Sequence, residues 1–450
     1  MISSFHLRLW FPFRFATLLG AGILLSLSSA QAQFFNDFDV APHSYYERTG
    51  TDAFSQLLTK REKGEYNFGT ETGLPLLQKM LEELKIPVSS QVLVYSQTSL
   101  QRNLVRPENP RAMYFDENIY LAVMAGGKLE VNSFDAEAGG IFYFEDPPKE
   151  RGDHVEFERP KSCLGCHGGS ATNFLPGPLA RSNFVSDTGR RMGGVRSHER
   201  ISHRIPFHER WGGYFVTGAP KTLEHMGNAY ATRDGGTVTI DLKSRASLDN
   251  LDGLFDPSLV LRGDSNILPL MLFDHQIEAH NLLVEMRYRE RISQYRAAEN
   301  EGVIPARTLT KTGAFADKLV KYLLFADEVS LAGHQVSPSQ DYLSDFSRNR
   351  KANEADESLK DFDLKSRLFK NRLSYMIYSE AFERAPQSMK DRIYTRLWKI
   401  LSPAEPVEGY DYFDEGERAR ILSILTATKS DLPADWGQAV NLAAAERAGR

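Results

Sequence analysis

Cysteine is almost absent from this chain, whose 450 residues include only Cys163 and Cys166. A disulfide-based scaffold uses more cysteines, spread along the chain, so this class of small secreted protein is excluded. A structural zinc site needs four ligands, commonly from a second Cys-x-x-Cys pair, and the sequence has no such second pair. A thioredoxin-like redox pair stays open as an alternative interpretation of the two thiols.

The sequence also lacks acidic residues before Asp37 and has only one long apolar run, over residues 15–27. Basic residues precede this run and Ala30-Gln31-Ala32 follows it, which is typical of a secretory signal peptide. The run is shorter than the about 20 residues that a membrane span needs. We therefore expect residues 1–32 to be a signal peptide that is cleaved near Ala32; an uncleaved anchor is the alternative. The mature chain should be periplasmic or otherwise exported and should have no membrane span.

A strong charge of either sign is missing as well. The formal net charge is −5, which excludes nucleic acid as an expected partner. Hydrophobic residues make up 41% and charged residues 25% of the chain, as in ordinary globular proteins. The length is sufficient for about two or three domains.

What the chain does contain is the motif Cys163-Leu164-Gly165-Cys166-His167. The spacing Cys-x-x-Cys-His allows two thiols to add across the two vinyl groups of one haem, which forms two thioether bonds. The adjacent histidine then lies under the iron as its proximal ligand. The motif predicts one covalent haem c held by Cys163 and Cys166, with His167 on the iron. Bacterial haem c is attached outside the cytoplasmic membrane, which agrees with the predicted export.

Hydrophobic periodicity predicts an α+β chain in three parts. These are an N-terminal α+β region with a short antiparallel meander (residues 33–150), a loop-rich c-type haem-binding segment (151–240) and a mainly helical region (241–450). The expected strands cover residues 92–95, 114–115, 119–123, 129–131, 141–144 and 237–240. The expected helices cover residues 75–84, 268–294, 315–331, 366–382, 389–401 and 415–426. Residues 33–70 are expected to be irregular and residues 337–360 to form a polar surface segment.

So small a sheet cannot bury both of its faces by itself. We therefore expect it to pack against the haem segment or the helical half.

The sixth iron ligand is not evident, because the chain has no Met-Pro pair of the type that usually supplies it. His203, close to the motif in sequence, is the candidate; His225 and His275 are further possibilities, and each histidine has a structural role as its alternative. His275 and His280 lie five residues apart on one predicted helix, about 140° apart around its axis, so both cannot face one iron. An iron without a sixth protein ligand would favour chemistry over plain electron transfer.

Other residues of the haem segment are candidates for contact with the cofactor. The carbonyl of Pro178 is expected to accept the Nδ1 proton of His167, with an ordinary Pro-Gly turn as the alternative. Trp211 is expected to direct its N–H to a haem propionate or a carbonyl, and the paired glycines after it permit close backbone approach, with core packing as the alternative. Between residues 181 and 210 there are seven arginines, no lysine and three acids. Some of these arginines could bind the propionates, although a solvated basic loop is the alternative for each: Arg181, Arg190, Arg191, Arg196, Arg200, Arg204 and Arg210.

The chain resembles a group of exported bacterial proteins described as cytochrome c domain-containing. The matching segments are residues 90–95, 110–115, 162–167, 210–218, 225–228, 274–276, 280–283 and 369–382. They extend over nearly the whole mature chain, which indicates one large unit rather than a small cytochrome with a foreign tail. Ala219-Pro220-Lys221 stands where the group often has a further histidine. The resemblance implies haem binding and electron transfer and implies no substrate.

Three functions follow as hypotheses. The first is an exported single-haem c-type cytochrome that exchanges electrons with a redox partner protein of unknown identity. The second is a haem-dependent oxidoreductase of peroxidase or oxygenase type, with no catalytic residue assigned. The third is a haem-based sensor of a gas or a redox state. A haem-binding electron carrier needs only about 100 residues, so most of this chain does something besides holding haem.

Overall fold

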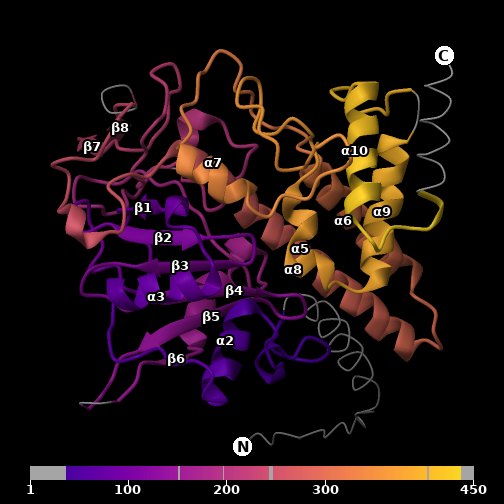
Figure 1. Ribbon diagram of the computed structural model, residues 1–450, viewed down its shortest axis with the longest axis horizontal. Coiled ribbons are helices and arrows are strands. Elements are labelled where there is room, and N and C mark those ends of the chain that lie inside the picture. Colours follow the sequence, from indigo (N-terminus) through magenta and orange to yellow (C-terminus); the bar gives the residue numbers. More distant parts are fainter. Residues whose placement is uncertain (1–36, 151–152, 196, 243–246, 403–404, 437–450) are drawn as a thin grey trace, which may run out of the picture.

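The computed structural model describes residues 37–150, 153–195, 197–242, 247–402 and 405–436 (Figure 1). The predicted signal peptide, residues 1–32, lies outside the described residues. An antiparallel sheet near the N-terminus is followed by a mainly helical C-terminal half, which confirms the predicted α+β class.

Six strands form the sheet, and they pair in the order in which they follow one another along the chain. Each pairing is antiparallel, so the sheet contains the meander expected over residues 112–145 and extends it by one strand at each edge. The strands are β1 (Val92–Val94), β2 (Arg111–Phe115), β3 (Ile119–Val123), β4 (Glu130–Asp135), β5 (Gly139–Asp146) and β6 (Glu156–Glu158). Strand β6 was not predicted, because it has a single apolar residue, Phe157, between two glutamates and lies in a charged stretch without a hydrophobic pattern.

The two faces of the sheet belong to two different cores, because successive side chains of a strand point in opposite directions. On β2, Ala112 and Tyr114 pack in the core with helices α2 (Ala53–Glu62) and α3 (Leu74–Leu84). Met113 and Phe115 of the same strand lie in the core shared with the helical half. The expected packing of the sheet on the helical half is therefore confirmed for one face, and helices of the N-terminal region cover the other.

Helix α3 forms where its apolar spacing predicted it. Leu77, Met80 and Leu81 are buried on one side, and the helix ends where Lys85 adopts a left-handed conformation with φ of 58°. Helix α2 was not predicted, since residues 33–70 were expected to be irregular. Its N-cap is a clear local signal, because the Asp52 carboxylate accepts hydrogen bonds from two backbone N–H groups of the first turn.

A 33-residue helix, α5 (Ile267–Glu299), connects the sheet to the helical half (Figure 1). The side chain of Asn266 caps its first turn. Most of α5 is buried all round, because it contacts β5 as well as several other helices. The remaining helices are α6 (Ala306–Leu323), α7 (Gln340–Ser347), α8 (Glu380–Glu383), α9 (Gln387–Leu401) and α10 (Glu415–Thr428). Of these, α7 lies within the segment expected to be a polar surface excursion, and α6 begins and ends earlier than predicted.

The helix predicted over residues 366–382 is wrong. The backbone N–H groups there bond to other segments: that of Lys370 donates to the carbonyl of Asp361, and that of Ser374 to the carbonyl of Leu323. Only the short turns η7 (Tyr375–Tyr378) and α8 form within or just beyond this stretch. Long-range hydrogen bonds thus replace the i to i−4 ladder that the local pattern favoured.

The haem segment is loop-rich, as predicted, with single turns in place of long elements. These turns are η3 (Lys161–Cys163), α4 (Leu164–His167), η4 (Ser170–Thr172) and η5 (Phe207–Glu209). The strand expected over residues 237–240 is β8 (Thr237–Ile240), which pairs with β7 (Ala231–Asp234). Within the described ranges, no helix is both long enough and apolar enough to cross a membrane.

Truncation of a buried side chain of α3 tests the outer core of the sheet. Leu77 is fully buried, so we expect Leu77→Ala to lower the free energy of unfolding by about 2–5 kcal/mol. The neighbouring exposed Gln78 is the control, and Gln78→Ala should change stability by less than about 0.5 kcal/mol. Urea denaturation of both variants measures the difference, and equal stabilities would show that α3 does not cover the sheet.

Candidate functional site

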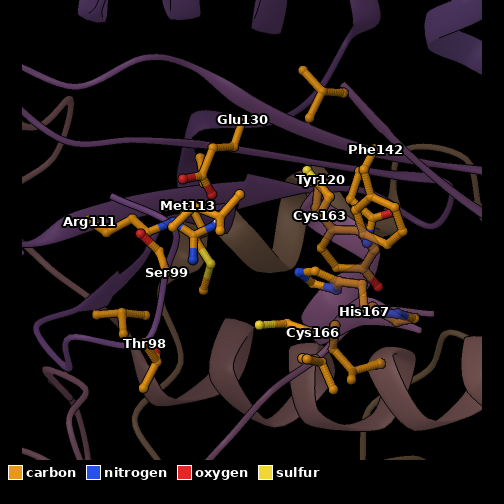
Figure 2. Close-up of a pocket in the computed structure, with 18 of the residues that line it drawn as sticks. Thr98, Ser99, Arg111, Met113, Tyr120, Glu130, Phe142, Cys163, Cys166 and His167 are labelled. Atoms are coloured by element: carbon orange, nitrogen blue, oxygen red, sulfur yellow. Dashed lines mark hydrogen bonds and ion pairs between the residues drawn. The ribbon is translucent and has the colours of Figure 1, made fainter. Parts of the chain in front are cut away.

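A cavity lies between the inner face of the sheet, the Cys-x-x-Cys-His motif and α5 (Figure 2). It contains about 1030 Å³ of space, its open mouth included. Its apolar walls include Tyr120 and Phe142 from the sheet and Phe273 and Ile277 from α5.

The motif forms one turn of helix beside this cavity. Cys163 ends η3, and Leu164–His167 is α4. Residues three or four apart lie on the same side of a helix, so the two thiols and the imidazole share one face. All three side chains line the cavity, and the cysteines are not joined in a disulfide.

The imidazole of His167 is held in one tautomer. Its Nδ1 lies 3.0 Å from the carbonyl oxygen of Gly177. A carbonyl only accepts hydrogen bonds, so Nδ1 carries the proton and Nε2 carries the free lone pair. Burial lowers the pKa of His167 to about 4, and Arg111 and Arg181 act in the same direction. His167 is therefore neutral near pH 7, which is the form that binds a metal ion.

The carbonyl that orients His167 is one residue earlier than predicted. The expected acceptor, Pro178, instead receives a hydrogen bond of 3.1 Å from the side-chain amide of Asn281 on α5. A Cβ atom at Gly177 would lie 2.1 Å from the Asn281 side-chain oxygen, so the Asn281 amide would have to move to admit a larger residue. Helix α5 thus positions the loop that positions the histidine.

The thiol of Cys163 does not have the properties of a redox nucleophile. Burial raises its pKa to about 11, so it is protonated at neutral pH. Catalytic thiols of redox pairs have lowered pKa values, because the thiolate is the reactive form. This property disfavours the thioredoxin-like interpretation.

Two arginines line the cavity. Arg181 was among the predicted residues, and its Nε lies 2.7 Å from a Glu199 carboxylate oxygen. Arg111 was missed, because it lies on β2, about fifty residues before the motif, and forms an ion pair with Glu130 in the cavity wall. The sequence feature that could have identified Arg111 is the alternation of side chains along the strand, which directs residue 111 to the same face as Met113.

The other predicted arginines do not line the cavity. Arg200 pairs with Glu278, Arg204 donates to the carbonyl of Ala326, and Arg210 pairs with the buried Asp274. Arg191 shares Glu199 with Arg181, Arg190 is exposed, and Arg196 lies outside the described residues. Residues of the helical half thus bind three of the arginines that were expected near the propionates: Arg200, Arg204 and Arg210.

The structure does not bring His203 to the cavity. Its ring is buried in the helical half, with Nδ1 2.9 Å from Nδ1 of His275 and its face stacked on Tyr322. His275 in turn lies 2.6 Å from the Ser374 hydroxyl. His225 and His280 are buried away from the cavity as well, and among the described residues that line it His167 is the only histidine. The rings of His203, His275 and His280 form hydrogen bonds to segments distant in sequence, and the ring of His225 packs edge-on against Trp211.

Trp211 also has a structural partner. Its indole N–H donates a 2.9 Å hydrogen bond to the carboxylate of Asp274, whereas a propionate or a carbonyl was expected. Gly212 and Gly213 do permit close approach, but their neighbours are the backbone of Asn183 and the side chain of Ser96. The paired glycines therefore allow this loop to pack closely against other segments of the protein.

Comparison with protein-family models, curated proteins and solved structures finds no match to this chain.

The buried histidines predict that acid destabilises the fold. Burial lowers the pKa of His275 to about 3, whereas an unfolded histidine titrates near 6.5. The folded pKa is the lower one, so the contribution to stability is complete above pH 6.5 and is lost as the pH falls from about 6.5 towards 3. Burial also lowers the pKa of His203 and His280, so the free energy of unfolding should fall steeply in this window.

We expect His275→Asn to be less stable than the wild type at pH 8 but to lose stability less steeply on acidification. The difference in slope should reach about 1.4 kcal/mol per pH unit between pH 6 and 4. His208→Asn, at an exposed histidine, should keep the wild-type slope. Chemical denaturation at a series of pH values measures this, and parallel curves for His275→Asn and the wild type would contradict it.

Proposed function

We propose that this protein is an exported c-type cytochrome that carries one covalent haem c and exchanges electrons with a redox partner protein. One observation carries the proposal: two thiols and a neutral imidazole, separated as in Cys-x-x-Cys-His, line one cavity. The hydrogen bond from His167 to Gly177 adds to this, because axial histidines are usually oriented by such a bond.

The residues of the cavity fit a haem in their chemistry. Cys163 and Cys166 would form the thioether bonds, and Nε2 of His167 would bind the iron. Arg111 and Arg181 supply guanidinium groups suited to the two propionates, each of which would replace or join the glutamate that now pairs with the arginine, Glu130 and Glu199 respectively. Apolar walls such as Phe142 and Ile277 exclude water from the macrocycle. The haem would supply a reversible one-electron change at iron.

Export supports the same function. The predicted signal peptide would direct the mature chain to the periplasm, where haem c is attached and where soluble carriers exchange electrons. The small formal charge and the ordinary composition suit a protein partner rather than nucleic acid.

A haem-dependent oxidoreductase or a haem-based sensor is the second candidate. The observation that favours it is the ion pair of Arg111 with Glu130 in the cavity wall, since a guanidinium and a carboxylate next to a bound haem could assist peroxide or gas chemistry. A high-spin ferric spectrum and binding of carbon monoxide or cyanide would support this candidate.

Attachment of haem is tested by producing the chain together with the haem-ligation machinery. We expect the mature wild type to gain the mass of one haem and to give a pyridine haemochrome of the haem c type. The Cys163→Ser/Cys166→Ser double variant should lose all covalent haem, because no other cysteine exists in the chain. Ser162→Ala, at an exposed neighbour of the motif, is the matched control and should keep the haem. A wild type with the mass of the bare polypeptide and no haemochrome would refute the proposal.

A further inference from the structure

Met113 is the one sulfur-bearing residue of the cavity outside the haem motif, within the part of the chain that the structure describes. Its side chain is 8% exposed. Figure 2 shows Met113 and His167 on opposite sides of the cavity. We propose that the thioether sulfur of Met113 is the sixth ligand of the haem iron, an inference that rests on the proposed function.

The position of Met113 is fixed by the sheet. Within β2 it pairs with Val92 of β1 and Ala122 of β3, so hydrogen-bonded strands flank it on both sides. Strand alternation directs residues 111, 113 and 115 to the inner face. Arg111 and Met113 both line the cavity, whereas Phe115 packs against Phe273 of α5. The sulfur is thus presented from a paired strand within the sheet rather than from a loop.

The other side chains of the cavity that carry a donor atom are less suited to the iron. Burial raises the pKa of Tyr120 and of Tyr214 well above the ordinary value, so both phenols stay protonated, whereas an iron-bound tyrosine is a phenolate. The hydroxyl of Tyr143 donates a hydrogen bond of 3.0 Å to the Asp52 carboxylate, so it is already engaged by another residue. Glu130 is held by Arg111 and also accepts a hydrogen bond from Gln101.

Met113 has no such competing bond. Within the described residues, its sulfur accepts no hydrogen bond, in contrast to Met226, whose sulfur accepts one from Ser182. A thioether is neutral and polarizable, so it enters an apolar cavity without the cost of burying a charge. Methionine opposite histidine also raises the reduction potential of a haem, which suits a carrier that receives electrons.

This assignment explains why no partner for the iron was evident in the sequence. Met113 lies fifty residues before the motif, and neither a Met-Pro pair nor a nearby histidine marks it. Antiparallel pairing of β2 with β1 and β3 is what places it on the same cavity as His167.

The test uses the haem-loaded protein and two substitutions of similar volume, Met113→Leu and Met80→Leu. Met80 is fully buried on α3, in the core on the other face of the sheet, and serves as the control. We expect the ferric wild type and Met80→Leu to show the long-wavelength absorption band of methionine-ligated iron. Met113→Leu should lose this band, should have a lower reduction potential and should bind carbon monoxide when reduced.

A third variant, Met113→His, supplies another ligand at the same place. It should give a low-spin spectrum without the methionine band and should not bind carbon monoxide, which separates loss of a ligand from general damage to the cavity. If the wild type gives a pyridine haemochrome but its spectrum does not change in Met113→Leu, methionine ligation is refuted and haem attachment stands. If the wild type gives no haemochrome, both proposals fall.

Discussion

The hydrogen bond from Nδ1 of His167 to the carbonyl of Gly177 is the interaction on which the candidate site depends. It decides which ring nitrogen keeps a lone pair, and burial then keeps the ring neutral. Its acceptor is held in turn, because Asn281 of α5 donates to the next carbonyl, that of Pro178, and its side chain packs closely against Gly177. The longest helix of the described residues therefore determines the orientation of a histidine more than one hundred residues earlier.

The two-faced sheet supplies the other half of the site. Its outer face is closed by α2 and α3, and its inner face meets α5, the Cys-x-x-Cys-His motif and the loop at residues 178–181. Because side chains alternate along β2, one face of this strand brings a cation, a thioether and an aromatic ring to the interior in sequence order: Arg111, Met113 and Phe115. A shift of one residue in the strand would instead direct Ala112 and Tyr114 inward, so the chemistry of the cavity depends on register.

Sequence reasoning succeeded where the signal is local. Strands β1 to β5 and helices α3, α5, α9 and α10 form close to where the local pattern of residues predicted them. It failed over residues 366–382, where the N–H of Ser374 donates a hydrogen bond to the carbonyl of Leu323. It also failed over α2, although the N-cap Asp52 is a local signal for the start of that helix. Arginine clustering near the motif was a poor guide to the cavity as well. Long-range partners bind three of these seven guanidinium groups, as Glu278 does for Arg200.

The sequence by itself determined the α+β class and the spacing of Cys163, Cys166 and His167, since both depend on residues that are near one another along the chain. Tertiary structure alone decided which residues surround them. Gly177 rather than Pro178 orients His167, His203 is buried with His275, and the cavity receives Arg111 and Met113 from a strand. The physical reason is that side chains converge on a cavity through strand register and helix packing. His167 and Gly177 are only 10 residues apart, but the other contacts join distant residues, such as His203 and His275, 72 positions apart. No local periodicity predicts such contacts.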